Sequence, residues 1–439
     1  MFRNLIYIFI LIISLSSCAS LPAMQSRVNR LAAKGDFQYA AHYFSEMPEG
    51  SYGKNNRLIE ALDRGMIFHY AGRYRRSIEF FEEAKKIYDE LYTKSLSKIA
   101  ASWLWNDSSL PYPGEDFERA MINVFQALNF LALGEHDEAL VEARNASSVL
   151  QALNDRYPKD LKNVYRDDAF VRMLAGILYE SLGERNDLND ALIDYRKALK
   201  LYETSFLVEC GIAVPEVLKE NFLSVSQWMG DDELSISKRR FQNTKIYSIK
   251  ERAGKGELYV IVYRGQIVNK VEGTVVLPGM DGLLTRISFP RYRKNFKSDK
   301  SVSMKVVSEQ EKEQMQFLNK AQDMDVIARL NLDNRRTRIL AKAVARPVTK
   351  QLFVETAEDY VVNKAGKEAG QLFNIAGQFY LLYSEQADLR SWGTLPSEIY
   401  LGRFILEPGN YRLFVDAKPV TSIEVSAGQK KFITYWFGY

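Results

Sequence analysis

Cysteine and histidine are scarce in this chain of 439 residues, which has two of the former and three of the latter. The histidines, His42, His69 and His136, have no second histidine at metal-ligand spacing, and Cys18 and Cys210 form no close pair. This argues against a zinc site. The sequence also lacks a Gly-x-Ser-x-Gly elbow and a phosphate-binding loop. We therefore predict no metal, no other cofactor and no enzymatic activity.

Dense basic runs are missing as well. The 59 basic and 55 acidic residues leave a net charge of only +4, which is not the charge signature of a nucleic-acid-binding protein. After the first twenty residues, no apolar stretch is long enough to cross a bilayer, which needs about 20 residues. We expect neither a nucleic-acid partner nor a membrane-spanning helix in the remainder of the chain.

The first residues have the pattern of an export signal. Arg3 supplies a positive charge, and the apolar run 5–13 (LIYIFILII) is too short to span a membrane. Leu-Ser-Ser-Cys at 15–18 then matches a lipobox, in which a peptidase cuts between Ser17 and Cys18 after the thiol has received a diacylglyceryl group. We predict a signal peptide over residues 1–17 and a lipidated Cys18.

Lipidation of Cys18 has two consequences. Two or more acyl chains, such as palmitate, on one cysteine give stable membrane anchorage, and Ala19 stands where Asp is the usual signal for retention in the inner membrane. We therefore expect a lipid anchor in the outer membrane, with the protein facing the periplasm. Cys210 is left without a disulfide partner, and its apolar surroundings predict a buried, inert thiol.

Residues 24–230 are rich in Ala, Leu, Glu and Lys and show helical periodicity. Four stretches share a glycine, a small residue five to eight positions later and further aromatic or small residues on the same face. They are Gly35 with Ala40 and Phe44, Gly72 with Ser77, Phe81 and Ala84, Gly134 with Ala139, Ala143 and Ala146, and Gly183 with Ala191, Tyr195 and Ala198. Gly65 and Gly176 precede two of them. The pattern resembles the tetratricopeptide repeat.

The spacing has a physical interpretation. Each glycine closes one helix and turns the chain into the next, and the small residue lets the two helices approach closely. Stacked pairs of this kind offer a groove. We predict a tetratricopeptide-like helical repeat domain over residues 18–240, with a plain helical bundle as the alternative. Trp103 and Trp105, in the loop 103–115, are either a lid over the groove or a packed connector.

Residues 241–439 have a mixed pattern, so the predicted fold class is α+β. Apolar or alternating runs predict strands at 257–263, 267–277, 287–292 and 302–307. Helical spacing predicts helices at 309–332, at 334–344 with a disturbance at Pro347, and at 354–383. Four short strands at about 395–439, separated by Gly-containing turns, predict a small β-sandwich, which the earlier strands can extend.

Basic residues recur every four positions at Arg338, Lys342, Arg346 and Lys350, so they line one face of a helix that continues past Pro347. This face is a candidate contact for an anion or a protein partner. The alternative is a solvated face or a set of ion pairs.

The segment 385–413 (EQADLRSWGTLPSEIYLGRFILEPGNYRL) resembles a signature of a poorly characterised family of bacterial tetratricopeptide-containing envelope lipoproteins. The order of Asp388, Arg390, Trp392, a strand, Pro-Gly and a second strand carries the resemblance, and stretches at 116–144, 256–270 and 338–350 agree with it. The resemblance implies an envelope lipoprotein, in loose association with other small lipoproteins that include activators of penicillin-binding proteins.

Asp388, Arg390 and Trp392 are a candidate partner-binding site; alternatively, Asp388 pairs with a basic side chain and Trp392 pins a helix end to the sandwich. Together these features predict a lipid-anchored scaffold or adaptor in the cell envelope whose partner is another envelope protein. One alternative is an activator or enzyme acting on peptidoglycan or envelope glycans. Another is a lipoprotein that binds a ligand in the helical groove.

Overall fold

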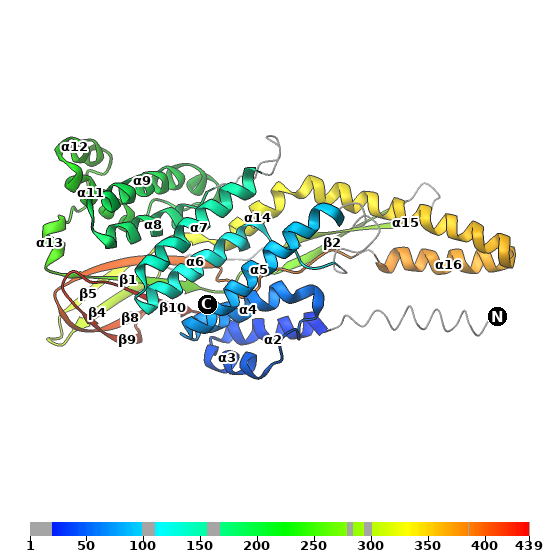
Figure 1. Ribbon diagram of the computed structural model, residues 1–439, viewed down its shortest axis with the longest axis horizontal. Helices are drawn as coiled ribbons and strands as arrows, with labels where there is room; N and C mark the ends of the chain where they lie inside the picture. Colours follow the sequence, from blue (N-terminus) through cyan, green and yellow to red (C-terminus); the bar gives the residue numbers. More distant parts are fainter. Residues whose placement is uncertain are drawn as a thin grey trace.

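The computed structural model describes residues 20–98, 110–155, 167–278, 284–293, 301–384 and 386–438. Figure 1 shows helices from the first half of the chain lying against strands from the second half, while a pair of long helices and a strand ribbon extend to one side. The class is α+β with the sheets in the C-terminal region, as the sequence predicted.

The first half of the chain forms four helical hairpins. They are α2 (Ser20–Lys34) with α3 (Phe37–Glu46), α4 (Arg57–Tyr70) with α5 (Tyr74–Lys98), α6 (Asp116–Leu133) with α7 (His136–Asp155), and α8 (Ala169–Leu182) with α9 (Arg185–Leu201). The turn of each hairpin contains a glycine with positive φ: Gly35 (73°), Gly72 (71°), Gly134 (78°) and Gly183 (82°). Only glycine adopts this conformation without strain, so the four glycines end the helices where the sequence predicted.

The glycines upstream of two turns allow close helix contact. A Cβ added to Gly65 on α4 would lie 2.5 Å from the ring of Phe81 on α5, and one added to Gly176 on α8 would lie 2.4 Å from the ring of Tyr195 on α9. Both aromatic side chains are fully buried. The absence of a side chain at these two glycines is therefore what lets each hairpin close around an aromatic ring.

Shorter helices lead into the strands. A π-helical turn (Tyr202–Phe206) and α10 (Leu207–Cys210) precede α11 (Glu216–Met229), α12 (Asp231–Arg240) and α13 (Ile249–Ala253). Cys210 ends α10 and is half-buried, which corrects the prediction of a buried thiol. Gly211 follows it with φ 65°, so the chain turns at this point and leaves the cysteine near the surface.

The strands form two four-stranded sheets and a ribbon. The first sheet has the order β10-β1-β7-β6, with β1 (Gly256–Arg264) parallel to β10 (Lys430–Phe437) and antiparallel to β7 (Glu398–Leu406), which pairs with β6 (Asn319–Asp323). The second is antiparallel, in the order β5-β4-β8-β9: β5 (Glu313–Phe317), β4 (Ser303–Ser308), β8 (Gly409–Val415) and β9 (Lys418–Val425). β2 (Lys270–Pro278) and β3 (Leu284–Tyr292) form the ribbon.

The first sheet is the middle layer of three. Alternate side chains of a strand point to opposite faces, and all nine residues of β1 are buried. Tyr259, Ile261 and Tyr263 pack in the core shared with the helices, whereas Leu258 and Val260 pack in a second core between the two sheets. Burial on both faces explains why β1 reads as a continuous apolar run.

The prediction of a helix over 309–332 is wrong for the first half of that range. β5 and β6 occupy that segment, and only α14 (Met324–Asn334) is helical. Met315, Leu318, Ala321 and Met324 mimic a helical stripe, but pairing of β5 with β4 and of β6 with β7 determines the local conformation. Leu318 lies in the core between the sheets, while Met315 is 61% exposed.

The next two predicted helices have different bounds. α15 (Arg336–Ala365) continues through Pro347, although proline removes one helical hydrogen bond. Gly366, with φ 90°, ends it, and α16 (Lys367–Ser384) returns alongside. These helices contact β3 and form, with β2, the extension seen in Figure 1.

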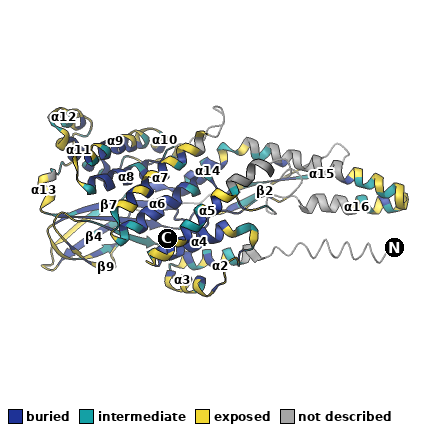
Figure 2. Ribbon diagram, viewed as in Figure 1, coloured by how far each residue is buried: buried dark blue, intermediate teal, exposed yellow. Residues whose placement is uncertain are grey.

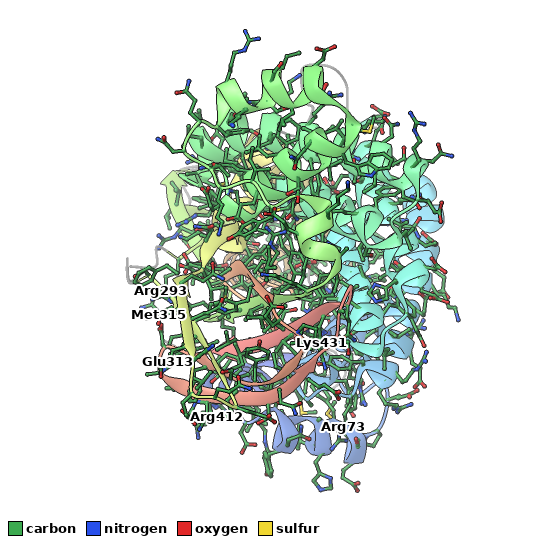
Figure 3. All side chains as sticks on the ribbon, turned by 90° about the vertical axis from the view of Figure 1, so that its left-hand side faces the viewer. Arg73, Arg293, Glu313, Met315, Arg412 and Lys431 are labelled. Carbon is green, nitrogen blue, oxygen red and sulfur yellow. The ribbon has the colours of Figure 1, made fainter. Side chains whose placement is uncertain are left out.

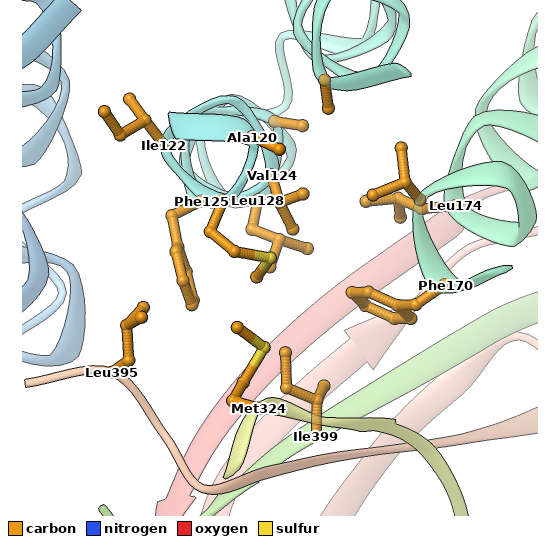
Figure 4. Close-up of a cluster of buried hydrophobic side chains, with 14 of the residues drawn as sticks. Ala120, Ile122, Val124, Phe125, Leu128, Phe170, Leu174, Met324, Leu395 and Ile399 are labelled. Carbon is orange, nitrogen blue, oxygen red and sulfur yellow. The ribbon is translucent and has the colours of Figure 1, made fainter. Parts of the chain in front are cut away.

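The four strands predicted over 395–439 are divided between the two sheets, and the earlier strands β1, β4, β5 and β6 complete these sheets. The predicted boundary at residue 240 also separates regions that share one core. Figure 4 shows side chains of α6, α8 and α14 meeting Leu395 and Ile399 of the C-terminal region. Buried residues run through helices and strands alike in Figure 2.

Candidate functional site

A polar pocket of about 460 Å³ opens where the two sheets meet the segment around α13. Residues 314–316 of β5 and 403–405 of β7 form one wall, and residues 245–247, Glu251, Arg252 and Lys255 form the other, with Glu220 of α11 beside them. We refer to it as the β5–β7 pocket. Glu313 and Met315, which mark β5 in Figure 3, lie at the margin of the sheets.

Two strand edges border this pocket. β5 is the outer strand of its sheet and pairs only with β4. β7 pairs with β1 along its whole length, but its pairing with β6 ends at Leu401, so residues 402–406 have a strand neighbour on one side among the described strands. The pairing of β7 with β6 ends here because β6 begins only after Leu318, where the chain passes from the second sheet (β5) to the first (β6). The side-chain amide of Gln316 donates a hydrogen bond to the carbonyl oxygen of Arg403 and so joins the two edges.

A buried charge network of six side chains lies behind the pocket. Its cations are Arg252, Arg403 and Lys430, and its anions are Glu180, Glu220 and Glu257. Glu257 is the centre: its carboxylate lies 3.2 Å from Arg252, 3.1 Å from Arg403 and 2.9 Å from Lys430. Each residue comes from a different helix or strand, so the ion pairs connect the helices α8, α11 and α13 with the strands β1, β7 and β10 of the first sheet.

The network fixes the charge state of its members. Burial alone would raise the pKa of Glu257, but Lys430, Arg252 and Arg403 outweigh it and leave the pKa far below its usual range. Burial alone would lower the pKa of Arg252, but Glu180 and Glu257 raise it above its ordinary value. Glu257 and Arg252 are therefore charged at neutral pH, because each has partners of opposite sign.

Two nitrogen atoms in this network lack a hydrogen-bond partner within the described ranges. The Nε–H groups of Arg252 and Arg403 are buried and have no hydrogen-bond partner among the described residues, and both arginines line the pocket. Four lining side chains are cationic (Lys245, Arg252, Lys255 and Arg403), and two are anionic (Glu220 and Glu251). The two arginines are balanced by Glu180, Glu220 and Glu257. Lys255 pairs with Glu407 at 2.9 Å, so the described lining carries no positive surplus.

The residues predicted as a partner site at 388–392 are enclosed instead. Asp388 accepts two hydrogen bonds from the guanidinium of Arg390 at 2.8 and 2.7 Å, and Arg390 also donates to the carbonyl oxygen of Leu110 at 2.8 Å. Trp392 has no exposed surface, and its backbone N–H donates to Glu118 at 2.8 Å. These contacts correct the candidate surface: the three residues tie the segment before β7 to the helices, which is the structural alternative.

The other predicted residues do not meet at the pocket. Ser17, Cys18, Trp103 and Trp105 lie outside the described residues. Arg338, Lys342 and Arg346 belong to one uninterrupted helix, α15, so their four-residue spacing is kept in the backbone; their side chains are outside the described part. α15 lies in the extension, and it contributes no residue to the lining of the β5–β7 pocket.

Sequence reasoning missed the pocket, because Glu220, Arg252 and Arg403 are far apart in the chain. A signal was present in the strands. Glu257 opens the apolar run of β1, and Arg403 interrupts the apolar run of β7. A charged residue inside an otherwise buried strand needs a partner of opposite sign, and such residues point to a network of this kind.

Two further findings concern the described residues as a whole. None of their helices is both long and apolar enough to cross a bilayer. Within the same ranges, no group of three or more His, Cys, Asp or Glu side chains is placed to hold a metal ion.

Comparisons with known proteins add little. No protein-family model matches the chain, and no curated protein matches it. Among solved structures that match, one is described as the crystal structure of BtubC (BKLC) from P. vanneervenii. It is 19% identical, the match covers 51% of this chain and 80% of that one, and the TM-score is 0.33. A likeness this low supports no conclusion about fold or function.

Proposed function

We propose that this protein is a lipid-anchored scaffold or adaptor of the bacterial cell envelope that binds a protein partner. The observation that carries the proposal is the pair of strand edges at the β5–β7 pocket. An unpaired edge offers backbone donors and acceptors to another chain, and natural proteins usually block such edges. On β5, however, Met315 and Phe317 are each 61% exposed. Exposed apolar side chains on an edge strand favour association with another protein.

The lipobox at 15–18 supports the location. A lipidated Cys18 followed by Ala19 favours the outer membrane with the protein facing the periplasm. We expect that Cys18→Ser abolishes incorporation of a radiolabelled palmitate and moves the protein from the membrane fraction to the soluble fraction. A variant that stays in the membrane fraction would contradict the lipid anchor.

We further propose that the helical hairpins are of the tetratricopeptide type. The four glycines with positive φ in the turns and the buried small residues Ala40, Ser77, Ala139 and Ala191 support this assignment. Such repeats are commonly protein-binding surfaces, so this assignment agrees with a scaffold function.

Photo-crosslinking in intact cells tests the proposal. A photoreactive amino acid replaces Met315 on β5, and the matched control replaces Ile236 on α12, which is similarly exposed at 64%. We expect a reproducible covalent adduct with an envelope protein from position 315 and none from position 236. Equal adducts at both positions, or none at position 315, would count against a partner at the strand edge.

A further inference from the structure

The outer face of α2 carries three cations. Arg27, Arg30 and Lys34 are spaced three and four residues apart, so their side chains share one face of the helix, and all three are exposed. Val28 and Ala32, on the opposite face, are buried in the core. Figure 1 shows α2 and α3 at the edge of the molecule. The cationic face is therefore turned towards the surroundings of the protein.

These cations are not neutralised by any described carboxylate. Arg27 lies over the ring of Tyr43 at 4.5 Å, and Arg30 donates a hydrogen bond to the hydroxyl of Ser26 at 2.6 Å. Within the described ranges, however, neither arginine forms an ion pair, and the lysine of this face forms none either. Asp36 is the first acid of the whole chain, and its side chain caps α3. The face therefore has a net positive charge.

A hollow of about 390 Å³ lies on this face, and it is lined by Arg27, Arg30, Leu31, Lys34 and Tyr39. We refer to these five residues as the α2 basic face. Guanidinium groups bind phosphate oxygens through paired hydrogen bonds. The ring of Tyr39 is 49% exposed, and tyrosine is enriched where protein meets the lipid–water interface. This combination suits phospholipid headgroups with a net negative charge.

The place of α2 in the chain brings this face close to the predicted anchor. The helix begins at Ser20, two positions after Cys18, so its first residue lies within about 7 Å of the cysteine. Each helical residue adds about 1.5 Å, which places Lys34 within roughly 30 Å of Cys18 and the two arginines nearer. Acyl chains on Cys18 lie in the membrane. A helix that lies along the membrane surface therefore holds all three cations at the headgroups.

We infer that the α2 basic face binds anionic phospholipid headgroups of the membrane that holds Cys18, and so orients the protein on that membrane. The inference rests on the lipid anchor of the proposed function. The acyl chains supply the affinity for the membrane, whereas the cations favour one orientation of the anchored chain. A lipid chain together with a basic patch is a common pair of membrane signals.

Photo-crosslinking of the lipoprotein in vesicles tests the inference. The full lipoprotein is reconstituted into vesicles of phosphatidylcholine alone or mixed with phosphatidylglycerol, and a photoreactive phenylalanine replaces Tyr39. We expect about tenfold more covalent lipid adducts in the anionic vesicles, and a loss of this difference at about 1 M salt, where the Debye length is only about 3 Å. The control position is Ile236 on α12, which lies away from α2 in Figure 1. Equal yields in both vesicles, or at both positions, would overturn the inference.

Matched variants locate the contact. One variant replaces the three cations of the α2 basic face by Gln, and the other replaces two arginines and one lysine that are exposed elsewhere: Arg185→Gln, Arg239→Gln and Lys312→Gln. Thermal unfolding shows that both variants fold. We expect the adduct yield of the first variant in anionic vesicles to fall to the level of neutral vesicles, and the yield of the second to stay unchanged. An unchanged yield in the first variant, or equal loss in both, would reject the α2 basic face as the contact.

The anchor and the basic face can fail separately. Flotation of the lipoprotein with vesicles at about 1 M salt reports the acyl chains, because salt screens the charges. A protein that does not float would reject the anchor and, with it, the inference. Flotation with adduct yields that ignore lipid charge would keep the anchor and reject the face. Three cations hold an unanchored chain only weakly, so Cys18→Ser is still expected in the soluble fraction.

Discussion

Trp392 lies with none of its surface exposed beside α5 and α6, where its ring meets Phe81 and Phe125 edge-on at centroid distances of 5.8 and 6.0 Å. Its indole N–H donates to Thr394 at 3.0 Å. From the sequence alone, a tryptophan in a turn-rich segment can be interpreted either as an exposed binding residue or as a buried anchor, because the sequence does not show what covers its side chain. Only the position of the helices decides between the two.

Replacing this side chain tests its structural role. We expect Trp392→Ala to lower the free energy of unfolding by about 3–5 kcal/mol, the usual cost of removing a large buried aromatic side chain. Urea denaturation followed by circular dichroism measures the change. Trp228→Ala, at a position 40% exposed, is the control and should cost much less. A similar loss in both variants would mean that Trp392 is not an anchor.

Asp63 is a buried carboxyl group near Trp392. Burial raises its pKa to about 7, although hydrogen bonds from Thr394 and Tyr52 act in the opposite direction. An unfolded aspartate has a pKa of about 4. Between these values the folded protein binds a proton that the unfolded chain releases, so stability falls as pH rises from about 4 to about 7 and then levels off.

The variant Asp63→Asn should lack this slope. We expect the stability of the wild type, relative to the variant, to decrease by up to about 1.4 kcal/mol per pH unit between pH 5 and 7. Denaturant titrations at several pH values measure it, with the exposed Asp232→Asn as control. Burial lowers the pKa of His69 to about 4, which destabilises the fold as pH falls below about 6.5, but this contribution cancels in the comparison. A difference independent of pH would be inconsistent with a buried, protonated Asp63.

At the scale of elements, the hairpins are the part of the fold that the sequence predicted best. Gly72, Gly134 and Gly183 carried a local signal, because a left-handed turn requires glycine. Strand pairing left no local signal in the sequence. β5 and β6 contain apolar residues at helical spacing, and their partner strands β4 and β7 lie elsewhere in the chain. Local patterns predict local structure, whereas the sheets and the β5–β7 pocket depend on contacts between distant segments.

Gly176 gives a test of the hairpin contacts. A methyl group at this position would overlap the ring of Tyr195, whose hydroxyl is held by a 2.6 Å hydrogen bond to Glu180. The ring cannot move without breaking that bond, so Gly176→Ala should destabilise the protein by about 1–3 kcal/mol, as overpacking does. Thermal unfolding measures it. Gly254→Ala, where a Cβ meets nothing within 4 Å, should be nearly neutral, and a neutral Gly176→Ala would show that α8 and α9 pack less tightly.

At the scale of the whole molecule, the helices and the first sheet share a continuous core that includes Phe125, Phe170, Tyr259 and Ile399. A composition change near residue 240 suggested two regions, and it does mark where strands begin. It does not mark where packing ends. The helices bury one face of β1, so neither region is complete without the other.

Truncation therefore gives a prediction. A fragment that ends at residue 240 loses β1 and exposes the helix surfaces that cover Tyr259, Ile261 and Tyr263. We expect it to aggregate or to bind a hydrophobic dye strongly, and the full chain to unfold in one transition that includes helices and strands. Limited proteolysis and dye fluorescence measure this. A soluble 18–240 fragment with a sharp thermal transition would disprove the shared core.

The contact between Trp436 and the first hairpin has a consequence for biogenesis. The ring of Trp436 on β10 lies 5.1 Å from that of Phe37 on α3, and it covers Gly35 in the α2–α3 turn. The ribosome makes this hairpin long before β10, because α3 begins at Phe37 and β10 at Lys430. The packing of the first hairpin is therefore complete only after β10 has been synthesised, so this part of the core forms after translation rather than during it.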